Sequence, residues 1–450
     1  MTMTTAPLTD HLLAEPAAPA AIRRLTATFA GELYLPGDLE YDVLRRPLNP
    51  AVDPHPAAVA VAANATDVRA AVTAARRYDV PFAVQATGHG THVGVDGGIL
   101  LNTSRLAGVH VDPQRRVARV GAGARWGHVL AAAAPYGLAP LAGSAPSVGV
   151  VGFTLGGGVG WLSRRYGYAA DSVIAAELVT ADGQRVRATA GENPDLHWAI
   201  RGGGPNFGVV TALEFRLYPV DDVYGGVSYF AADRAVQTLA RYREWIATIP
   251  DELSTALVVT QLPDADGVPA ELRGRKFIAI KALYAGDAGA GRRLLEPLRQ
   301  IAGPAVVDGY RAQPFSRLAM GGTPPRQLEL VRKLDDVSID AIVGAVGDPH
   351  SPVSAVEVRH WGGAIAAAGP DAGPIGHRDV PFSVIADARD DALVEALRPA
   401  ATGGSFLNFL GDTARTATAY TPADLRCLAG VKAMWDRDNF FRAGHNIPPA

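Results

Sequence analysis

Cysteine is nearly absent from this sequence, which holds a single cysteine, Cys427, among its 450 residues. A disulfide needs two cysteines, and a structural zinc site of the thiolate type needs several. The chain therefore cannot build a disulfide framework within itself, and zinc chemistry of the cysteine type is excluded.

Excess charge and long apolar runs are missing as well. The formal net charge is −3, from 42 basic and 45 acidic residues, and no long block of Lys or Arg occurs. Nucleic acid and anionic membrane are therefore not expected as partners, and a small-molecule partner is favoured. No run approaches the roughly 18 apolar residues of a spanning helix, and the N-terminus lacks the apolar segment of a signal peptide. We expect a cytoplasmic protein, and its oligomeric state stays open.

The remaining composition favours a globular protein with more than one domain, because the chain is long and 48% of it is hydrophobic. Residues 57–86 have the pattern of a strand, a helix and a strand, with Thr66 or Asp67 as the expected N-cap of the helix. Short strands and glycine-rich loops follow up to Pro219. Beyond about residue 224 glycine becomes sparser and longer helices are expected, one of them over residues 233–249. Its expected apolar face is Val236, Leu239, Tyr242 or Arg243, and Ile246.

The stretch QATGHGTHVG, residues 85–94, places His89 and His92 in a loop of small residues directly after an apolar run. Three explanations are open: a metal site, a phosphate site, or a turn without a ligand. A His-x-x-His pair in a loop lacks the fixed helical face of a chelating motif, and Asp96 is the only carboxylate nearby, so a metal is disfavoured. A structural turn explains His92 best.

Two further loops are rich in glycine, TLGGGVGWLSRRYG at residues 154–167 and RGGGPNFGVV at residues 201–210. Uncovered backbone amides in the first loop can form a nest for a diphosphate, and a strand bend is the structural alternative. In the second loop, Arg201 can cap the preceding helix through its dipole. No P-loop motif is present, and the glycines in RVARVGAGARWG fit a dinucleotide fingerprint poorly. Three such loops in one domain favour a large phosphate-bearing cofactor.

Several motifs occur together and in a fixed order: ATGHGTHVG, RVARVGAGARWGHV, SAPSVGVVGFTLGGGVGWLSRRYGYAADSV, ELVTADG, PDLHWAIRGGGPNFGVV, FLNFLGD and FFRAGHNIP. In these motifs the chain resembles the berberine bridge enzyme-like branch of the FAD-linked oxidases, which have the vanillyl-alcohol oxidase fold. The resemblance covers about residues 56–219 and 406–448, and more weakly the middle of the chain through VEVRHWGGA and GHRDVPF.

The resemblance implies an α+β fold in four parts. Residues 1–50 are an N-terminal extension with a first helix, and residues 51–220 are the main part of a PCMH-type FAD-binding domain. Residues 221–400 are a substrate domain, a large antiparallel sheet flanked by helices. Residues 401–450 return to the FAD-binding domain and complete it.

The resemblance also gives the histidine loop a role. It implies that His89 bonds covalently to the 8α-methyl group of FAD while residues 86–91 wrap the pyrophosphate. Relatives with a second covalent link use a cysteine where Ala145 stands, so one histidyl link is implied and no metal. The implied cofactor-binding residues are Ala86, Thr87, Gly88, His89, Gly90, Thr91, Val148, Gly149, Gly152, Gly156, Gly157, Gly158, Gly160, Gly208, Val210, Asn408 and Asn446.

The implied reaction is the oxidation of an alcohol or amine carbon by hydride transfer to the flavin. Val148 occupies the family position that controls oxygen access, which implies O2 as acceptor and H2O2 as product. The proton acceptor is open because Phe409 stands where many relatives have a tyrosine, and a phenyl ring accepts no proton. The candidates are Tyr166, Tyr284, Tyr310 and His377, and the alternative is a reaction that needs no side-chain base, as when an amine substrate arrives already neutral. By analogy alone, the substrate is an intermediate of bacterial natural-product synthesis.

Two alternatives to an oxidase remain. Phe409 keeps open a flavin-containing protein that binds a small molecule, for instance to sequester a drug, with little redox turnover. A hydrolase with a metal on His89 and His92 is the other alternative, and it requires stoichiometric metal in the purified protein.

Overall fold

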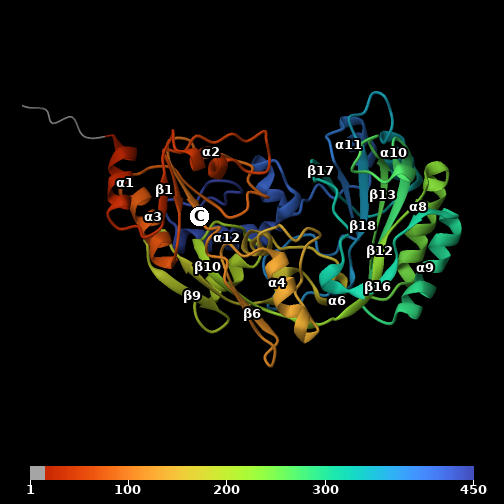
Figure 1. The fold of residues 1–450 in the computed structure, drawn as a ribbon, viewed down its shortest axis with the longest axis horizontal. Helices are drawn as coiled ribbons and strands as arrows, with labels where there is room; N and C mark the ends of the chain where they lie inside the picture. The colour runs from red at the N-terminus through yellow and green to blue at the C-terminus, as the bar shows by residue number, and fades with distance from the viewer. Residues whose placement is uncertain (1–15) are drawn as a thin grey trace, which may run out of the picture.

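The structure is a computed structural model that describes residues 16–450. Figure 1 shows the N-terminal elements at one end of the molecule, a large sheet with helices at the other, and the C-terminus among the N-terminal elements. The expectation for residues 1–15, that they carry no signal peptide, lies outside the described residues. Across residues 16–450, every helix falls short of the length and apolarity that crossing a membrane requires.

The first layer is a four-stranded sheet in the order β1-β2-β4-β3. Its strands are β1 (Glu32–Tyr34), β2 (Ala58–Val61), β3 (Phe82–Gln85) and β4 (Ile99–Asn102), and β2, β4 and β3 run parallel. The helices of this part are α1 (Ala17–Thr26), α2 (Leu39–Arg45) and α3 (Ala65–Arg77). The loop with His89 therefore follows β3 at the carboxyl edge of a parallel set of strands, where α/β folds commonly bind ligands.

The expected N-cap of α3 is wrong. Asn64 accepts hydrogen bonds from the amides of Thr66 and Asp67 at 2.8 and 3.1 Å and is the N-cap. Asp67 is buried instead, and its carboxylate accepts hydrogen bonds from the amides of Ala30 and Ala63. Asp67 thus joins the first turn of the helix to two neighbouring segments, which leaves the capping role to the residue before the helix.

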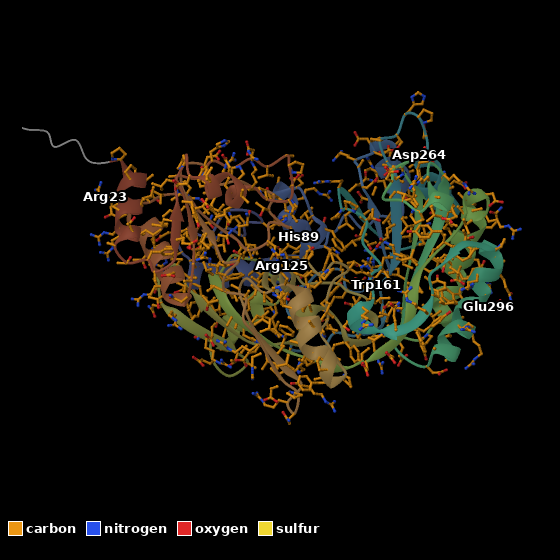
Figure 2. The ribbon with its side chains drawn as sticks, in the orientation of Figure 1. Arg23, His89, Arg125, Trp161, Asp264 and Glu296 are labelled. Carbon is orange, nitrogen blue, oxygen red and sulfur yellow. The ribbon has the colours of Figure 1, made fainter. Side chains whose placement is uncertain are left out.

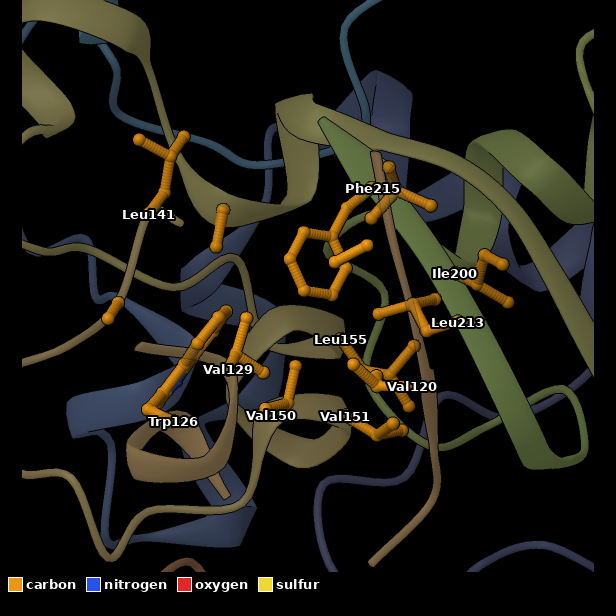
Figure 3. Packing of buried hydrophobic residues seen from close by; sticks show 14 of the residues in the cluster. Val120, Trp126, Val129, Leu141, Val150, Val151, Leu155, Ile200, Leu213 and Phe215 are labelled. Carbon is orange, nitrogen blue, oxygen red and sulfur yellow. The ribbon is translucent and has the colours of Figure 1, made fainter. Parts of the chain in front are cut away.

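The second layer is a five-stranded antiparallel sheet in the order β5-β6-β10-β8-β9. Its strands are β5 (Val109–Asp112), β6 (Val117–Gly121), β8 (Val173–Val179), β9 (Arg185–Thr189) and β10 (Val209–Arg216), and a short separate pair is formed by β7 (Leu138–Ala139) and β11 (Tyr218–Pro219). The helices here are α4 (Trp126–Ala133), α5 (Val150–Leu155), α6 (Ser163–Tyr166) and α7 (Pro194–Ile200). Figure 3 shows side chains of α4 and α5 packed near Phe215 of β10, in one hydrophobic cluster.

The third layer is an eight-stranded antiparallel sheet, with the path β15-β12-β14-β13-β18-β19-β17 and β16 also paired with β12. Its strands are β12 (Asp222–Ala231), β13 (Leu253–Gln261), β14 (Lys276–Tyr284), β15 (Ala305–Asp308), β16 (Arg311–Pro314), β17 (Gln327–Val331), β18 (Ala355–His360) and β19 (Phe382–Ala386). Helices α8 (Ala235–Trp245), α9 (Ala288–Ala302), α10 (Asp336–Ala345) and α11 (Asp391–Leu397) flank it (Figure 1). The predicted α+β class with a large flanked sheet is confirmed.

The predicted apolar face of α8 is partly wrong. Val236 is 39% exposed, whereas Leu239 and Tyr242 are buried as expected. Ala235 and Trp245 are buried as well, so the apolar stripe runs one position away from Val236. The large Tyr242 and Trp245 rings bury more apolar surface than a valine does, and their spacing sets the orientation of the helix.

The two faces of the eight-stranded sheet meet different parts of the molecule. Ile278 and Ile280 of β14 belong to the cluster that contains the side chains of the flanking helices. Leu283 of β14 and Ala256 of β13 belong instead to the cluster of α4, α5 and β10. Side chains alternate along a strand, so Lys281 of β14, two residues before Leu283, also lies on the face turned toward the second layer.

The C-terminal residues pack on the first two layers. Helix α12 (Pro422–Trp435), which the sequence predicts residue for residue, packs on α7, and Trp435 Nε1 donates a hydrogen bond to Asp195 at 2.8 Å. Farther along, the ring of Phe440 stacks on Phe82 of β3 at a centroid distance of 5.2 Å. The domain boundaries near residues 50, 220 and 400 stay predictions.

Candidate functional site

The loop of residues 86–91 has one packed side and one open side. The carbonyl of Gly88 accepts a hydrogen bond from the amide of Leu48 at 3.2 Å, and Gly88 has a φ of +72°, where glycine is favoured. A Cβ atom at Gly88 would lie 2.9 Å from Cα of Pro47, so the chain passes too close for a larger residue. A Cβ atom at Gly90 would meet no atom of residues 16–450 within 4 Å.

His89 is solvent-accessible in this loop, and its Nε2 lies 3.1 Å from Oγ of Ser147. Desolvation by neighbouring protein atoms lowers the pKa of His89, and the positive charge of Arg125 lowers it further. The imidazole is therefore neutral at pH 7, with one unprotonated ring nitrogen that can act as a nucleophile. Figure 2 places His89, Arg125 and Trp161 in the middle of the molecule and Arg23 and Glu296 toward its two ends.

Residues 145–152 lie directly against the histidine loop. A Cβ atom at Gly149 would lie 3.3 Å from Oγ1 of Thr87, and the backbone of Gly149 forms an isolated bridge with Arg125. Val148 is half-buried against the cluster of the second layer. Gly152 lies on helix α5, and a Cβ atom there would meet no described atom outside the helix backbone within 4 Å, so the helix is open on this side.

The glycines of residues 156–160 do not form the predicted nest of uncovered amides. The amides of Gly156 and Gly157 donate hydrogen bonds to backbone carbonyls within the preceding helix α5, at 3.4 and 3.0 Å. The amide of Gly158 donates to Oδ1 of Asn408 at 2.8 Å, and that of Gly160 to Oγ of Ser163 at 2.9 Å. That prediction is wrong because these donors are used within the protein.

Asn408 fastens this glycine run to the C-terminal part of the chain. Besides accepting from Gly158, Asn408 donates from Nδ2 to the carbonyl of Phe153 at 3.0 Å. Gly157 and Gly158 have φ values of +110° and +75°, and a Cβ atom at Gly158 would lie 2.5 Å from the Phe153 ring. The run therefore requires glycine for close packing, and its role toward a cofactor stays a prediction.

The loop of residues 201–210 is tied to the C-terminal tail through Asn206. Its Nδ2 donates to the carbonyls of Gly203 and His445 at 2.8 and 2.9 Å, and its Oδ1 accepts from the amide of Ile447 at 2.9 Å. Asn446 lies between these two tail residues, and its Oδ1 is buried without a partner among residues 16–450. A buried acceptor without a donor is uncommon, and it fits a hydroxyl or N–H group of a bound molecule.

Other residues of the same loop have structural roles. Arg201 donates from Nε to the carbonyl of His197 at 3.3 Å, at the end of α7, which is the helix-capping alternative that the sequence offered. Gly208 has a φ of +151°, and a Cβ atom there would lie 2.8 Å from the carbonyl oxygen of Val179. Val210 is buried in β10 next to this contact.

The four candidate proton acceptors lie in different surroundings. Tyr310 donates its hydroxyl hydrogen to the carbonyl of Ile280 at 2.7 Å, and burial raises its pKa. Tyr284 packs on the helix side of the sheet, beside α9. Tyr166 stacks on Tyr218 at 4.1 Å, and Nε2 of His377 lies 2.8 Å from the carbonyl oxygen of Thr418. The structure does not bring these four residues together.

Phe409 packs against Phe406, with ring centroids 5.4 Å apart, and contacts the cluster formed by Tyr168, Trp361 and residues of β17 and β19. Its ring is therefore part of an aromatic wall. Phe409 provides no acid or base there.

His92 lies beside His445, with ring centroids 5.6 Å apart. Burial lowers the pKa of His92 and lowers that of His445 to about 4, so both rings are neutral at pH 7. In the part of the chain that the structure describes, no group of three or more His, Cys, Asp and Glu side chains is arranged to hold a metal ion.

A cleft of about 570 Å³ lies at the opposite, N-terminal end of β3. Its lining includes Val80, Phe82, Val93, Asp438 and Phe440, and none of the predicted cofactor-binding residues. The cleft is thus separate from the carboxyl edge of the sheet where the histidine loop lies.

Sequence reasoning missed a buried charged group on the eight-stranded sheet. Glu357 accepts hydrogen bonds from Lys281 and Arg359 at 3.0 and 2.7 Å, and the guanidinium of Arg359 lies 4.7 Å from the centre of the Trp161 ring. The available signal was the presence of charges inside the apolar strands FIAIKALYAG and SAVEVRHWGG. Charged residues at positions that strand alternation buries are rare unless they are paired or functional.

Comparison with known families matches two separate segments of the chain that both contribute to the site. Residues 56–189 match the FAD binding domain family, and residues 405–448 match the family described as berberine and berberine-like. These two segments contain the histidine loop, residues 145–160 and Asn408, which the structure places against one another. The chain shares these two segments with the berberine bridge enzyme-like FAD-linked oxidoreductases.

Known relatives cover most of the chain. An FAD-linked oxidoreductase of Dictyostelium discoideum is 27% identical over 86% of this chain and 87% of its own length. The (R)-6-hydroxynicotine oxidase of Paenarthrobacter nicotinovorans is 37% identical over 42% of either protein. The structure of glucooligosaccharide oxidase from Acremonium strictum, described with a 6-S-cysteinyl, 8α-N1-histidyl FAD, has a TM-score of 0.79 and 23% identity, covering 96% of this chain and 99% of that one. The last likeness shows a common fold.

The residues of this site fit an FAD molecule. Gly90 faces open space from the histidine loop and Gly152 from helix α5, and Asn446 offers a buried oxygen without a partner among residues 16–450. His89 is neutral and accessible at the rim of the first loop. These features supply close backbone approach, an acceptor and a nucleophile, which a large phosphate-bearing cofactor can use.

Proposed function

We propose that this protein is an FAD-dependent oxidase that removes a hydride from an alcohol or amine carbon of a small organic molecule. The observation that carries the proposal is the neutral, accessible His89 beside Ser147, where the loops of residues 86–91 and 145–152 meet. FAD supplies the hydride acceptor when it is bound. The names of two relatives support the substrate classes, since one oxidises 6-hydroxynicotine, an amine, and the other a glucooligosaccharide, an alcohol.

Residues 51–220 and 401–450 hold the cofactor in this proposal, and residues 221–400 cover it. Contacts across the parts support this division, because Asn408 bonds to Gly158 and Asn206 bonds to the tail. The substrate then enters between the glycine loops and the eight-stranded sheet. A bacterial natural-product intermediate in the cytoplasm is the proposed substrate.

The cofactor is attached through one covalent bond, from His89. Ala145 stands where a second, cysteinyl link would form, and Cys427 lies far along the sequence on the exposed surface of α12. Electron withdrawal by the 8α substituent favours oxidation of the substrate, and the bond prevents loss of the cofactor.

A denaturing gel viewed for flavin fluorescence tests the attachment, with a His89→Ala variant and a His92→Ala control. Fluorescence is expected to stay with the wild-type chain and with His92→Ala, and to leave the chain in His89→Ala. Flavin released from the wild-type chain would contradict the covalent bond and leave the fold unaffected. A protein that holds no flavin and takes up none would overturn the proposed function.

O2 is the proposed electron acceptor, because the half-buried Val148, just before Gly149 and helix α5, matches the position that controls oxygen access in the resemblance. After anaerobic photoreduction, mixing with oxygenated buffer is expected to reoxidise the wild-type flavin rapidly and to form H2O2. A Val148→Leu variant is expected to reoxidise at least about tenfold more slowly than wild type. This corresponds to an increase in the activation barrier of about 1.4 kcal/mol or more. Val93→Leu, an exposed change, serves as the control. Equal rates in wild type and Val148→Leu would contradict the gating role.

A flavin-containing binding protein is the second candidate function, and Phe409 favours it because the ring provides no proton acceptor. Anaerobic mixing with candidate alcohols and amines separates the two functions. Bleaching of the flavin by any of them is expected for the oxidase, whereas binding without bleaching supports the second candidate.

A further inference from the structure

Three charged side chains lie side by side on the sheet face turned toward the second layer. Lys281 of β14 and Arg359 of β18 both stand opposite Ala256 of β13, so these residues form a row across adjacent strands. Glu357 accepts from Lys281 Nζ with one carboxylate oxygen at 3.0 Å and from Arg359 Nη2 with the other at 2.7 Å. We call Lys281, Glu357 and Arg359 the charged triad.

The charged triad carries one more positive than negative charge. Burial alone would raise the pKa of Glu357, but Arg359 and Lys281 outweigh it and lower the pKa to about 2, so the carboxylate is ionised. Thr323 donates to Glu357 at 3.2 Å, Trp161 covers the guanidinium, and the cationic Arg164 lines the same small cavity as Arg359. Among residues 16–450, Lys281 and Arg359 have ion pairs with Glu357 alone. An unbalanced buried charge is costly, and an anion beside it relieves that cost.

The two cations, rather than the carboxylate, reach accessible space. The side chains of Lys281 and Arg359 are 9% and 8% exposed, and that of Glu357 is 1% exposed. Nζ of Lys281 has three hydrogens, of which one goes to Glu357 and one makes a long contact of 3.5 Å to the carbonyl of Gly321. Lys281 therefore keeps one donor for a ligand.

The charged triad faces the loops that the proposed function assigns to the flavin. Trp161, under Arg359, belongs to the glycine-rich stretch of residues 154–167. Gly322, next to the carbonyl that Lys281 contacts, lies against Ser144, since a Cβ atom there would be 3.8 Å from Cβ of Ser144. Ser144 is three residues before Ser147, the neighbour of His89.

We propose that the charged triad binds a carboxylate of the substrate, with Lys281 as the hydrogen-bond donor and Arg359 as a second positive charge. Glu357 is a positioning residue that holds both cations in place. The substrate class is then an organic acid that also carries the alcohol or amine carbon to be oxidised. This inference rests on the proposed function for the identity of the reaction, whereas the anion site itself is a property of these three side chains.

Calorimetric titration of the flavin-loaded protein with benzoate, and with benzamide as its uncharged analogue, tests the proposal. Wild type is expected to bind benzoate about tenfold or more tightly than benzamide, as one charge-assisted hydrogen bond predicts. Lys281→Met is expected to abolish this preference. Lys276→Met is the control, because Lys276 lies on the same strand and donates to the carbonyl of Val343 away from the triad.

The Glu357→Gln variant is expected to change the affinity for benzoate in the opposite direction. The change keeps the size of the side chain and leaves both cations unneutralised, so benzoate is expected to bind more tightly than in wild type. A site in which Glu357 binds a substrate ammonium predicts the reverse, with weaker binding of benzylamine in this variant. Thermal unfolding of each variant confirms that it is folded.

Equal affinities for benzoate and benzamide in wild type, or no measurable binding of benzoate, would overturn the proposal without any variant. Benzoate binding that survives in Lys281→Met would overturn it as well. The visible spectrum of the same samples reports flavin content separately. A colourless protein that prefers benzoate refutes the proposed function and supports the anion site. A yellow protein that binds benzoate and benzamide equally supports the proposed function and refutes the anion site.

Discussion

Lys432 joins three segments of the chain at one atom. Its fully buried Nζ donates to the carboxylate of Asp436 at 2.7 Å and to the carbonyls of Asn206 and Phe441, each at 2.8 Å. Burial lowers the pKa of Lys432, and its hydrogen bond to Asp436 opposes that shift. The ammonium thereby connects α12, the loop of residues 201–210 and the C-terminal tail, all of which border the proposed cofactor site.

Replacing Lys432 with methionine is expected to lower the free energy of unfolding by about 3–5 kcal/mol, because Asp436 and two carbonyls lose a buried partner. Urea denaturation measures the change. Lys333→Met, which removes an exposed pair with Asp335, is the control and is expected to change stability little. A loss no larger than that of the control would contradict the role of Lys432 as a fastening residue.

Among the elements, the two kinds of glycine loop differ in whether the surrounding atoms leave room for a side chain in place of glycine. Gly158 is held in a left-handed conformation, and a Cβ atom there would collide with Phe153 and with Ala169 at 2.8 Å. Gly90 has open space where its side chain would be. Packing inside the protein therefore explains the first glycine, whereas the second is free of such a constraint.

Gly158→Ala is expected to lower the free energy of unfolding by about 2–4 kcal/mol, from backbone strain and overpacking together. Gly90→Ala is expected to leave the stability of the flavin-free protein unchanged and to reduce flavin content, because its methyl group would enter the space proposed for the pyrophosphate. Denaturation curves and the visible spectrum measure the two effects. Full flavin content in Gly90→Ala would argue against that placement of the cofactor.

At the scale of the whole molecule, buried histidines make stability depend on pH. Burial lowers the pKa of His197 and His445 to about 4 and that of His360 to about 3, and the positive charges of Arg201 and Arg164 act in the same direction on His197 and His360. Each is neutral when folded and takes up a proton when unfolded at mildly acidic pH. The unfolded state therefore binds more protons below the ordinary histidine pKa of about 6.5.

Stability is accordingly expected to be full above pH ~6.5 and to fall as the pH drops toward ~4, by up to about 1.4 kcal/mol per pH unit for each histidine. Lowered carboxyl pKa values, such as that of Glu357, act only at lower pH. Urea denaturation between pH ~7.5 and ~5 measures the slope. His360→Gln is expected to flatten it, and His350→Gln, an exposed change, is not. A stability that is constant over this range would contradict the prediction.

Local signals in the sequence predicted much of the fold. Alternating and helical periodicity placed most strands and α12, and the order of the glycine motifs indicated the family and the loops around His89. Such features depend on residues close in the chain, whose spacing alone fixes the face that they present. Distant partners account for part of the failures, since Asp67 bonds to Ala30 and the amide of Gly158 bonds to Asn408.

The sequence by itself determined the composition, most helices and strands, and the resemblance to FAD-linked oxidoreductases, because these follow from residue types at short spacing. The tertiary structure decided which residues meet. It joined Asn408 to Gly158 across 250 positions and set Lys281 beside Glu357 across 76. It also showed that the amides of Gly156, Gly157, Gly158 and Gly160 are used internally. Strand register and the packing of layers create these contacts, and no local pattern encodes them.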